Sequence, residues 1–374
     1  MRILCLFKRR YMRKDVIVDR YGRLYELPLA LARLGHEVRV ICLNYRGVAA
    51  PFDAIDTRGT GRLHWQSCDL GRLLLPGLLR YRRTVLKVLD EFAPKLVLGG
   101  SDSLHVAMTR HFARAAGLPY AVDLYDNYAS FGLTQLPGLH QAYRRAVADA
   151  NAVTCVSEPL RAMVESSYAP RGSVTTLEST INRDLFFPRA RSESRERLGL
   201  PLNARLIGTA GALDASRGIA SLYRAYEQLR ARHADLHLVL AGSRDGAEAL
   251  PAAPGIIHLG ELSHERIPDL FSALDVAVIC MRDTAFGRYA FPQKAYEIIA
   301  CQTPVVAARV GALSSLLREQ ANSLYDVDNV ASLSQCIAAQ LANPTPCTVV
   351  PPDWAAQALR LEGILCEVVA EAAR

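Results

Sequence analysis

Two charged side chains stand at the start of an otherwise apolar helical segment in the second half of the chain. The stretch FPQKAYEIIACQTPVVA (residues 291–307) has Lys294 and Glu297 three positions apart, on one face of a helix. The helix dipole favours a glutamate there but not a lysine, so Lys294 indicates a nearby anion. Glu297 is suited to accept hydrogen bonds from the vicinal hydroxyls of a sugar. An intrahelical salt bridge, worth about 0.2–0.5 kcal/mol, would explain the same spacing.

A glycine-containing turn gives a second group of candidates. In RLIGTAGALDASRG, Gly208 and Gly211 bracket a small-residue turn, and Arg217 precedes the next helix. Backbone N–H groups and the dipole of such a helix can hold a phosphate, and an arginine adds a bidentate charge. The same pattern also serves ordinary helix–sheet packing with a solvated arginine. The turn alone therefore leaves both interpretations open.

These loops must be positioned by alternating strands and helices. Short β-branched runs separated by helical segments occur in both halves of the chain, which predicts parallel sheets with right-handed crossovers. Strands are predicted at 2–7, 36–43, 95–100, 119–125, 152–157, 205–211, 236–242, 255–261, 275–280 and 303–308. Helices are predicted at 21–35, 158–168, 218–233, 266–274 and 293–301. The predicted fold class is α/β, with two Rossmann-like doubly wound domains facing across a cleft and chemistry in the loops after the strands.

Length and composition agree with two domains. The chain has 374 residues, of which 50% are hydrophobic, enough for two cores. The polar stretch 188–201 is the expected boundary. Nine scattered cysteines without a CxxC pair argue against a disulfide framework or a zinc site and indicate a reducing cytoplasm. No apolar run reaches the roughly 18 residues of a spanning helix, and MRILCLFKRR is interpreted as a buried strand rather than a signal peptide.

Positive charge is concentrated in the first quarter of the chain. Residues 1–90 carry 18 Lys and Arg against 8 Asp and Glu, whereas the rest has a net charge of −3. Such an asymmetry suggests nucleic acid, anionic lipid or an anionic substrate, or serves solubility alone. Within it, residues 71–89 combine leucines with a cluster of four basic side chains at 80–87, and this segment is either an interfacial amphipathic helix or a core-facing helix with a solvated basic side. The cluster is Arg80, Arg82, Arg83 and Lys87.

Taken together, these segments resemble a glycosyltransferase of the GT-B fold, in the family 4 group. The resemblance rests on FPQKAYEIIACQTPVVAA, on GTAGALDASRGIASLYRAY and LHLVLAGS, on IIHLGELSHERIPDLFSALDVAVI, and on VTCVSEPLRAMV and TTLESTINRDLFFP. It implies an acceptor-side domain at 1–187 and a nucleotide-sugar donor domain at 188–351. The segment PDWAAQALRLEGILCEVV resembles the closing helix, which implies that 352–374 cross back to the N-terminal domain.

The resemblance assigns roles to individual residues of the donor half. Glu297 matches the second glutamate of an E-x7-E motif, which binds the nucleotide ribose, while the first falls on Tyr289. The chain is instead similar to a subgroup with P-x-K-x-x-E, here Pro292, Lys294 and Glu297. Of the family's two basic residues in the phosphate loop, one is replaced by Ala212 and the other is Arg217, so Lys294 or Arg288 supplies the missing charge. The donor-binding set implied is Glu297, Gly211, Arg288, Phe291 and Pro292.

The implied activity is transfer of a sugar, with retention, from a nucleotide-diphosphate donor to a hydroxyl acceptor. The expected catalytic residues are Arg217, Lys294 and Asp126, where Asp126 stands in the loop that often holds a histidine in the family. Basic side chains replace an obligatory metal, since Asp123 and Asp126 have the wrong spacing for a cation site. The nucleotide sugar is a co-substrate, and no other cofactor is expected. The front-face route lets the leaving phosphate act as base.

The expected setting is bacterial surface polysaccharide or glycolipid assembly. The partners are the donor, a glycan or lipid-linked acceptor and an anionic membrane surface, with no nucleic acid. The protein is expected in the cytoplasm, peripherally on the inner face of the membrane. A GT-B sugar-nucleotide epimerase and a non-catalytic partner subunit are the alternatives. A nucleic-acid-binding protein would account for the charge, but the sequence offers no motif for it.

Overall fold

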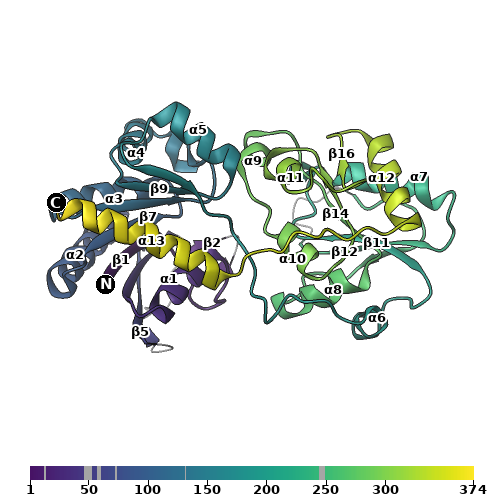
Figure 1. Cartoon of the computed structure of the whole chain (residues 1–374), viewed down its shortest axis with the longest axis horizontal. Coiled ribbons are helices and arrows are strands. Elements are labelled where there is room, and N and C mark those ends of the chain that lie inside the picture. Colours follow the sequence, from purple (N-terminus) through teal and green to yellow (C-terminus); the bar gives the residue numbers. More distant parts are fainter. Residues whose placement is uncertain (12–13, 46–52, 57–59, 72–73, 131, 244–248) are drawn as a thin grey trace. The chain divides into compact units, whose positions relative to one another are not determined.

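The computed structural model describes residues 1–11, 14–45, 53–56, 60–71, 74–130, 132–243 and 249–374, and the chain forms two compact units (Figure 1). Unit 1 comprises Met1–Ser179 together with Trp354–Arg374, and unit 2 comprises Thr180–Asp353. Each unit is a parallel sheet with helices on both faces. The predicted class, two doubly wound α/β domains, is confirmed.

Unit 1 is built on an eight-stranded sheet in the order β10-β9-β8-β7-β1-β4-β6-β5. Its strands are β1 (Arg2–Lys8), β4 (Glu37–Asn44), β5 (Asp53–Asp56), β6 (Arg62–Asp69), β7 (Leu96–Gly100), β8 (Tyr120–Leu124), β9 (Ala152–Cys155) and β10 (Ser173–Thr176). Neighbouring strands are parallel except the edge pair β5 and β6. A small hairpin, β2 (Arg10–Tyr11) and β3 (Lys14–Asp15), follows β1.

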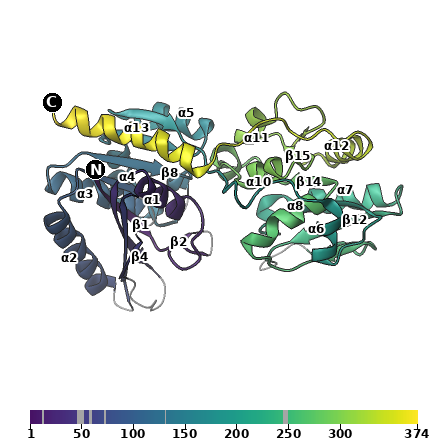
Figure 2. The same ribbon diagram turned by 60° about the horizontal axis from the view of Figure 1, so that its bottom comes forward.

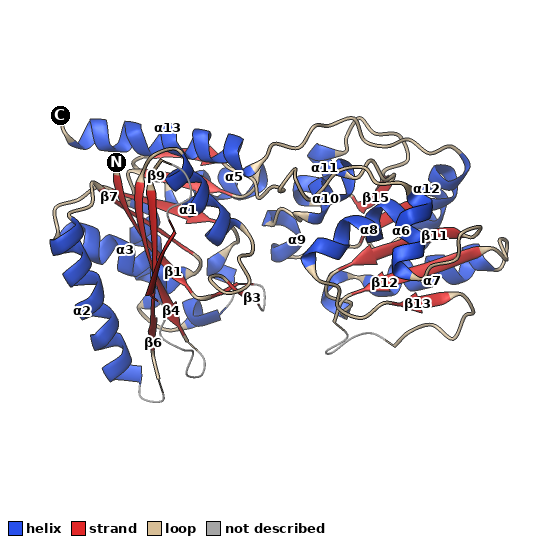
Figure 3. Ribbon diagram, turned by 90° about the horizontal axis from the view of Figure 1, so that it is seen from below, coloured by secondary structure: helices blue, strands red, loops and turns tan. Residues whose placement is uncertain are grey.

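Helices cover both faces of this sheet, as Figures 2 and 3 show. The helices of unit 1 are α1 (Arg23–Arg33), α2 (Leu74–Phe92), α3 (Ser103–Ala115), α4 (Leu139–Ala148), α5 (Glu158–Tyr168) and α13 (Trp354–Ala372). Helices α2 and α3 lie on one side of β1 and β4, and α1 lies on the other (Figures 2 and 3). Short 3₁₀ turns at Tyr128–Ser130 and Gly132–Gln135 precede α4.

The last helix of the chain belongs to the first unit. Helix α13, yellow in Figure 1, packs against α1, and its Trp354, Leu361, Leu365 and Val368 are buried in the core of unit 1. The expected return of the C-terminal helix to the N-terminal domain is therefore seen. Because this helix crosses back, the chain passes between the units twice.

Unit 2 has a six-stranded parallel sheet in the order β13-β12-β11-β14-β15-β16. The strands are β11 (Arg205–Ala210), β12 (Leu236–Ala241), β13 (Ile256–His258), β14 (Val276–Ile279), β15 (Val305–Ala308) and β16 (Leu324–Tyr325). The helices are α6 (Arg191–Leu198), α7 (Ile219–Arg230), α8 (Ile267–Ala273), α9 (Ala285–Tyr289), α10 (Lys294–Ala300), α11 (Gly311–Leu316) and α12 (Val330–Ala342). Helices α7 and α12 pack together, and α8 packs with α6 and α10.

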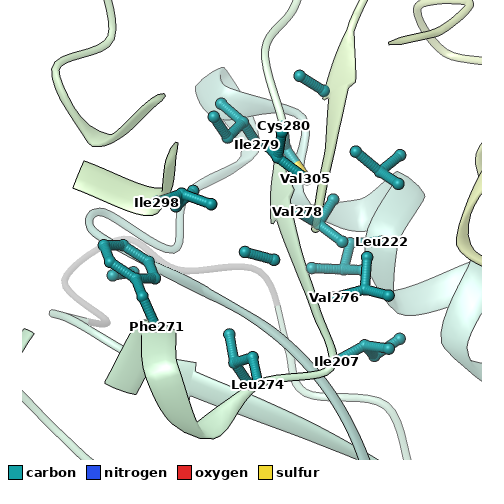
Figure 4. Close-up of a cluster of buried hydrophobic side chains, with 14 of the residues drawn as sticks. Ile207, Leu222, Phe271, Leu274, Val276, Val278, Ile279, Cys280, Ile298 and Val305 are labelled. Carbon is teal, nitrogen blue, oxygen red and sulfur yellow. The ribbon is translucent and has the colours of Figure 1, made fainter. Parts of the chain in front are cut away.

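The core of unit 2 fixes the strands from which the functional loops leave. Figure 4 shows Ile207 of β11, Val276 and Val278 of β14 and Val305 of β15 gathered with side chains from α7, α8 and α10. Strands buried on both faces read as nearly continuous apolar runs, which is why the sequence pattern found them.

The polar stretch at 188–201 lies inside unit 2 and not at its border. It contains α6, which packs on α8: Arg197 of α6 lies 2.9 Å from Asp269 of α8, and Arg195 of α6 lies 2.9 Å from Asp275, two residues after α8. The division between the units falls at Ser179, ahead of the expected position, so residues 180–187 belong with unit 2. A charge-rich segment resembles a linker in sequence, but here its arginines have carboxylate partners on α8 and in the residues just after it.

All nine cysteines are free thiols, and seven of them are buried. Among the described residues, no helix combines the length and the apolar character that a membrane-spanning segment requires.

Candidate functional site

The order of strands in unit 2 singles out one position at the carboxyl edge of its sheet. From β11 the chain continues outward to β12 and β13, whereas from β14 it continues in the opposite direction to β15 and β16. Ligands in doubly wound sheets bind at such a switch point, beyond the carboxyl ends of the two diverging strands. The loops after β11 and β14 carry most of the predicted donor residues.

Lys294 lies directly against the turn after β11. Its ammonium group donates a hydrogen bond to the carbonyl of Ala210, the last residue of that strand. A Cβ atom added to Gly211 would lie 2.9 Å from the Lys294 Nζ, and Gly211 has a φ of 117°. The backbone conformation therefore favours glycine at this position, and a side chain here would displace the Lys294 ammonium. The two predicted residues Lys294 and Gly211 are brought together.

The charge of Lys294 is opposed by its surroundings. The pKa of this half-buried ammonium is lowered, chiefly by desolvation and further by the positive charge of Arg217, while Cys280 and Glu297 act in the opposite direction. Two cations therefore share the mouth of the switch point. An anion bound there would compensate Lys294 for its lost hydration and offset the repulsion between Lys294 and Arg217.

Arg217 is held over an aromatic ring. It ends a 3₁₀ turn (Ala215–Arg217), and its guanidinium carbon lies 4.1 Å from the centre of the Phe286 ring in α9. A cation over the face of an aromatic ring is attracted by the ring quadrupole, and the planar guanidinium keeps its N–H edge available for further contacts. Arg217 is only half-buried, so that edge remains accessible.

Glu297 is the buried carboxylate of the group, with a side chain that is 9% exposed. Its Oε1 atom accepts a hydrogen bond from the Nε2 of Gln293 at 3.2 Å. The Nε2 of His264 lies 3.7 Å from the same oxygen, which is an electrostatic contact rather than a hydrogen bond. A buried carboxylate with neighbours on one oxygen is well placed to accept from hydroxyls on the other.

The remaining donor-side predictions lie around the same loop but in different roles. The guanidinium of Arg288 is exposed and paired with Asp283, with Nε 2.5 Å from Oδ1. The Phe291 ring packs against Tyr296, with ring centres 4.7 Å apart, and the Pro292 carbonyl accepts from the Ala295 amide at 2.8 Å. Among the described residues, the cation that contacts the Gly211 turn is Lys294, which favours Lys294 over Arg288 as the missing charge.

Asp126 belongs to unit 1, in the loop after β8. Its Oδ1 accepts from the Asn127 amide at 2.8 Å, and the side chain is half-buried. The neighbouring Asp123 is committed elsewhere: it forms a buried two-point pair with Arg23, at 2.7 and 2.8 Å, and accepts from Thr154. Among the described residues there is no cluster of three or more His, Cys, Asp or Glu side chains arranged to hold a metal ion.

Sequence reasoning missed a polar cluster at the carboxyl edge of the unit 1 sheet. The switch point of this sheet lies between β1 and β7. The Lys8 amide donates to Ser101 Oγ at 2.8 Å, and Asp102 accepts from Tyr45 at 2.9 Å and from both the amide and Nδ1 of His105 at 2.9 Å. Lys8 is the last residue of β1, Tyr45 follows β4, and Ser101 and Asp102 follow β7. The available signal was Asp102, a helix N-cap residue directly after a buried strand.

The charges of this cluster influence one another. The pKa of Lys8 is lowered, mainly by burial, although Asp102 and Asp126 act to raise it. For Asp102, burial acts to raise the pKa, but the charge and hydrogen bonds of His105 together with Lys8 outweigh it, so the net shift is downward. Asp126 therefore lies in the field of Lys8, at the mouth of the unit 1 sheet.

The basic residues at 8–14 do not form one open surface. Arg9 is buried, with its Nε 2.8 Å from Asp15 and an Nη1 bond of 2.8 Å to Ser67. Arg10 and Lys14 are exposed, and Arg13 lies outside the described residues. Part of the basic excess thus anchors the β2–β3 hairpin to the sheet.

Comparison with known proteins assigns the family. The model of the glycosyl transferase 4-like domain matches residues 23–179, and the model of the glycosyl transferases group 1 matches residues 204–343. The chain belongs to the GT-B glycosyltransferases of the family 4 group. The fold of this glycosyltransferase agrees with that assignment. Sucrose-phosphate synthase from Thermosynechococcus elongatus superposes with a TM-score of 0.79 over 99% of this chain and 100% of that one, at 18% identity.

Two relatives share more sequence with this family 4 glycosyltransferase. A protein from Bacillus subtilis (strain 168), named as the teichuronic acid biosynthesis glycosyltransferase TuaC, is 26% identical over 272 residues, which are 70% of this chain and 68% of that one. The GDP-mannose-dependent alpha-(1-6)-phosphatidylinositol monomannoside mannosyltransferase of Mycolicibacterium smegmatis is 28% identical over 251 residues, 64% of this chain and 65% of that one. The match therefore spans about two thirds of each relative.

Proposed function

We propose that this glycosyltransferase moves a hexosyl group, with retention of anomeric configuration, from a nucleotide-diphosphate sugar to a hydroxyl of a glycan or lipid-linked acceptor. The pathway proposed is the assembly of a bacterial surface polysaccharide or glycolipid. Family membership supports the transfer reaction, and the names of the two relatives support the pathway and the type of donor. Unit 2 binds the donor, and unit 1 binds the acceptor.

The observation that carries the proposal is the contact of Lys294 with the Gly211 turn. Here the half-buried ammonium of Lys294 lies at the switch point of a parallel sheet, beside Gly211, which has no side chain, and the cation of Arg217 acts on it. A diphosphate fits such a place because it satisfies two positive charges and backbone N–H groups at once. Glu297 binds the nucleoside portion of the donor, since its buried carboxylate can accept hydrogen bonds from the ribose hydroxyls.

The chemistry follows from these charges. The bond between the anomeric carbon and the phosphate oxygen breaks, and the negative charge that develops on the diphosphate is stabilised by Lys294 and Arg217. The acceptor oxygen attacks from the same face, and its proton passes to an oxygen of the leaving diphosphate. Asp126 orients the acceptor hydroxyl in unit 1. No step in this sequence requires a divalent cation, because the neutralising charges belong to the side chains.

Helix α2 supports a lipid-linked acceptor and a peripheral position on an anionic membrane. Its buried stripe includes Tyr81, Val85 and Val88, yet Leu75, Leu79 and Leu86 are exposed on the opposite stripe. Residues 75, 79, 82 and 86 recur at helical spacing, so these leucines share one face. Basic side chains flank this face and are exposed: Arg80, Arg82, Arg83 and Lys87. Exposed leucines between basic residues are the composition of an interfacial helix.

A panel of UDP- and GDP-sugars tests the proposed function. Thermal shift should identify a donor, since a ligand at 100 times its Kd adds about 2.7 kcal/mol of stability. With that donor and a polyprenyl- or phosphatidylinositol-linked glycan, the enzyme should release nucleoside diphosphate only when acceptor is present, and EDTA should leave the rate unchanged. Release without acceptor would favour an epimerase, and binding without turnover a partner subunit. Loss of activity in EDTA that a divalent ion restores would contradict the metal-independent mechanism.

A further inference from the structure

Glu297 is approached on a single oxygen by two side chains from different elements. Gln293, one turn earlier in the chain, donates to Oε1 at 3.2 Å, and the His264 Nε2 lies 3.7 Å from the same atom. Neither contact uses Oε2. A carboxylate with two equivalent oxygens can rotate, whereas one whose Oε1 is engaged from two directions presents a defined Oε2.

His264 is itself held in place. It opens a 3₁₀ turn (His264–Arg266) after β13, and its ring lies 5.2 Å, centre to centre, from that of Phe186. Phe186 is buried, and it comes from the segment 180–187 that the structure assigns to unit 2. The same turn is attached to α6 by Arg266, which donates to the Arg197 carbonyl at 2.8 Å. The imidazole is therefore fixed between a core aromatic ring and the Glu297 carboxylate.

We propose that Gln293 and His264 are positioning residues that hold Glu297 by Oε1, so that Oε2 faces the ribose hydroxyls of the donor nucleotide. The inference rests on the proposed function, because it assumes a nucleoside diphosphate at this site. Fixing the carboxylate before binding removes an ordering cost that would otherwise reduce affinity. The consequence is specific: the pair determines how strongly the site prefers a ribonucleotide over its 2′-deoxy form.

The preference is measured by calorimetry with two nucleotide pairs, UDP with 2′-deoxy-UDP and GDP with 2′-deoxy-GDP. The pair whose ribose form binds the wild type is then followed through the variants. In the wild type the 2′-deoxy form should bind roughly 10-fold or more weakly, because a hydrogen bond to a charged group is lost. Glu297→Ala should bring the ratio of the two Kd values close to 1. Gln293→Ala and His264→Ala should each lower the ratio several-fold, and the double variant should approach Glu297→Ala.

Three comparisons separate positioning from other roles. His264→Gln keeps a polar side chain at this position and should retain more of the preference than His264→Ala. In a Glu297→Ala background, Gln293→Ala should have no further effect, since the residue acts through the glutamate. Gln335→Ala, a change of the same type at an exposed position of α12, should leave both Kd values and the melting temperature at wild-type values.

The outcomes also distinguish this inference from the proposed function. If the wild type binds neither UDP nor GDP, the proposed function fails. If nucleotides bind but Glu297→Ala keeps the ribose preference, the ribose assignment and this inference fail together. If Glu297→Ala removes the preference while the Gln293 and His264 variants keep it in full, only the positioning role is overturned. An equal loss of affinity for both members of a pair would show that the variants merely disturb the fold.

Discussion

At the scale of single residues, Lys294 is a lysine whose surroundings in the folded protein disfavour the protonated, charged form of its side chain. Burial and Arg217 both lower its pKa, while its ammonium contacts the Ala210 carbonyl at the edge of the sheet. A bound anion would stabilise the protonated form of Lys294 in the folded protein. A perturbed pKa at the carboxyl edge of a parallel sheet is characteristic of functional sites.

Replacing Lys294 should therefore separate stability from function. Lys294→Met keeps the length of the side chain and removes the charge. Calorimetry should show that Lys294→Met no longer binds a nucleoside diphosphate, while the melting temperature of the variant equals or exceeds that of the wild type. A cation whose pKa is lowered on folding binds its proton more tightly in the unfolded chain, so wild-type stability should increase with pH from the lowered pKa up to the ordinary value near 10.5.

The stability difference between the wild type and Lys294→Met should accordingly shrink as the pH rises through that window. Urea denaturation at several alkaline pH values measures it. A variant that is clearly less stable than the wild type at neutral pH would mean that the lysine is a structural residue.

Arg217 should matter more for turnover than for donor binding. Its charge is needed most when the phosphate departs, so Arg217→Ala should lower kcat by roughly 100-fold while KM for the donor changes much less. Steady-state kinetics with the identified donor and acceptor checks this. The matched control is Arg224→Ala on the exposed face of α7, which should behave as the wild type. Activity of Arg217→Ala within a few-fold of the wild type would identify Arg217 as a surface residue.

At the scale of elements, helix α2 has two opposite apolar stripes. One stripe packs in unit 1, and the other exposes Leu75, Leu79 and Leu86 between basic side chains. A solvated helix of a soluble domain needs only the first stripe. The second stripe is the reason we propose that the helix contacts a lipid surface.

Vesicle co-sedimentation tests that assignment. The protein should bind vesicles with anionic phospholipid but not neutral ones, and binding should fall with salt, because each basic residue near the surface contributes about 1 kcal/mol that is screened over roughly a Debye length. Changing Arg80, Arg82, Arg83 and Lys87 to Gln should abolish binding. A control removes the same number of exposed charges elsewhere in unit 1, at Arg33, Arg62, Lys95 and Arg171. If both variants lose vesicle binding equally, the binding depends on the overall positive charge of unit 1 and not on helix α2 in particular.

Elements also show what the sequence could and could not predict. Strands such as β11, β12 and β14 were predictable because each is a buried β-branched run between helices. Strand β6 (RLHWQSCD) was not predicted, because its several polar residues obscure the alternation of apolar and polar positions. It pairs with an antiparallel edge strand. Helix α6 was taken for a linker because its packing depends on Arg195 meeting Asp275, some 80 residues later in the chain.

Part of the candidate site was predictable from the sequence, and part of it depends on contacts between residues far apart in the chain. Lys294, Glu297 and Gly211 stand in short motifs, so their spacing reveals them. Lys8, Tyr45 and Asp102 are far apart in the chain and meet only because β1, β4 and β7 end at one edge of a sheet. The role of Arg288 near the phosphates stays a prediction; its guanidinium is paired with Asp283 five residues earlier, a local contact that the motif does not encode.

At the scale of the whole molecule, the last helix completes the first unit. Leu361, Leu365 and Trp354 of α13 are buried in the core of unit 1, although they follow all of unit 2 in the chain. Burying a large apolar side chain contributes about 1.5–3 kcal/mol, so these contacts are a substantial part of the stability of unit 1.

Leu365→Ala should therefore destabilise unit 1 by about 2–5 kcal/mol, since it empties a fully buried position. Hydrogen exchange should rise in the sheet and α1 of unit 1, while unit 2 keeps its protection and its nucleotide affinity. Leu359→Ala, at an exposed position of the same helix, is the control. An equal loss of protection in unit 2 would show that the two units do not unfold separately.

The central claim is that unit 2 binds a nucleoside diphosphate through Glu297, Lys294 and Arg217. The most direct test is isothermal titration calorimetry of UDP and GDP against the wild type, Glu297→Ala and, as a control, Glu227→Ala at an exposed position of α7. We predict one-to-one binding of at least one nucleotide to the wild type and to the control. Glu297→Ala should bind that nucleotide roughly 10-fold or more weakly with an unchanged melting temperature. Equal affinity of all three proteins, or no binding to the wild type, would contradict the account.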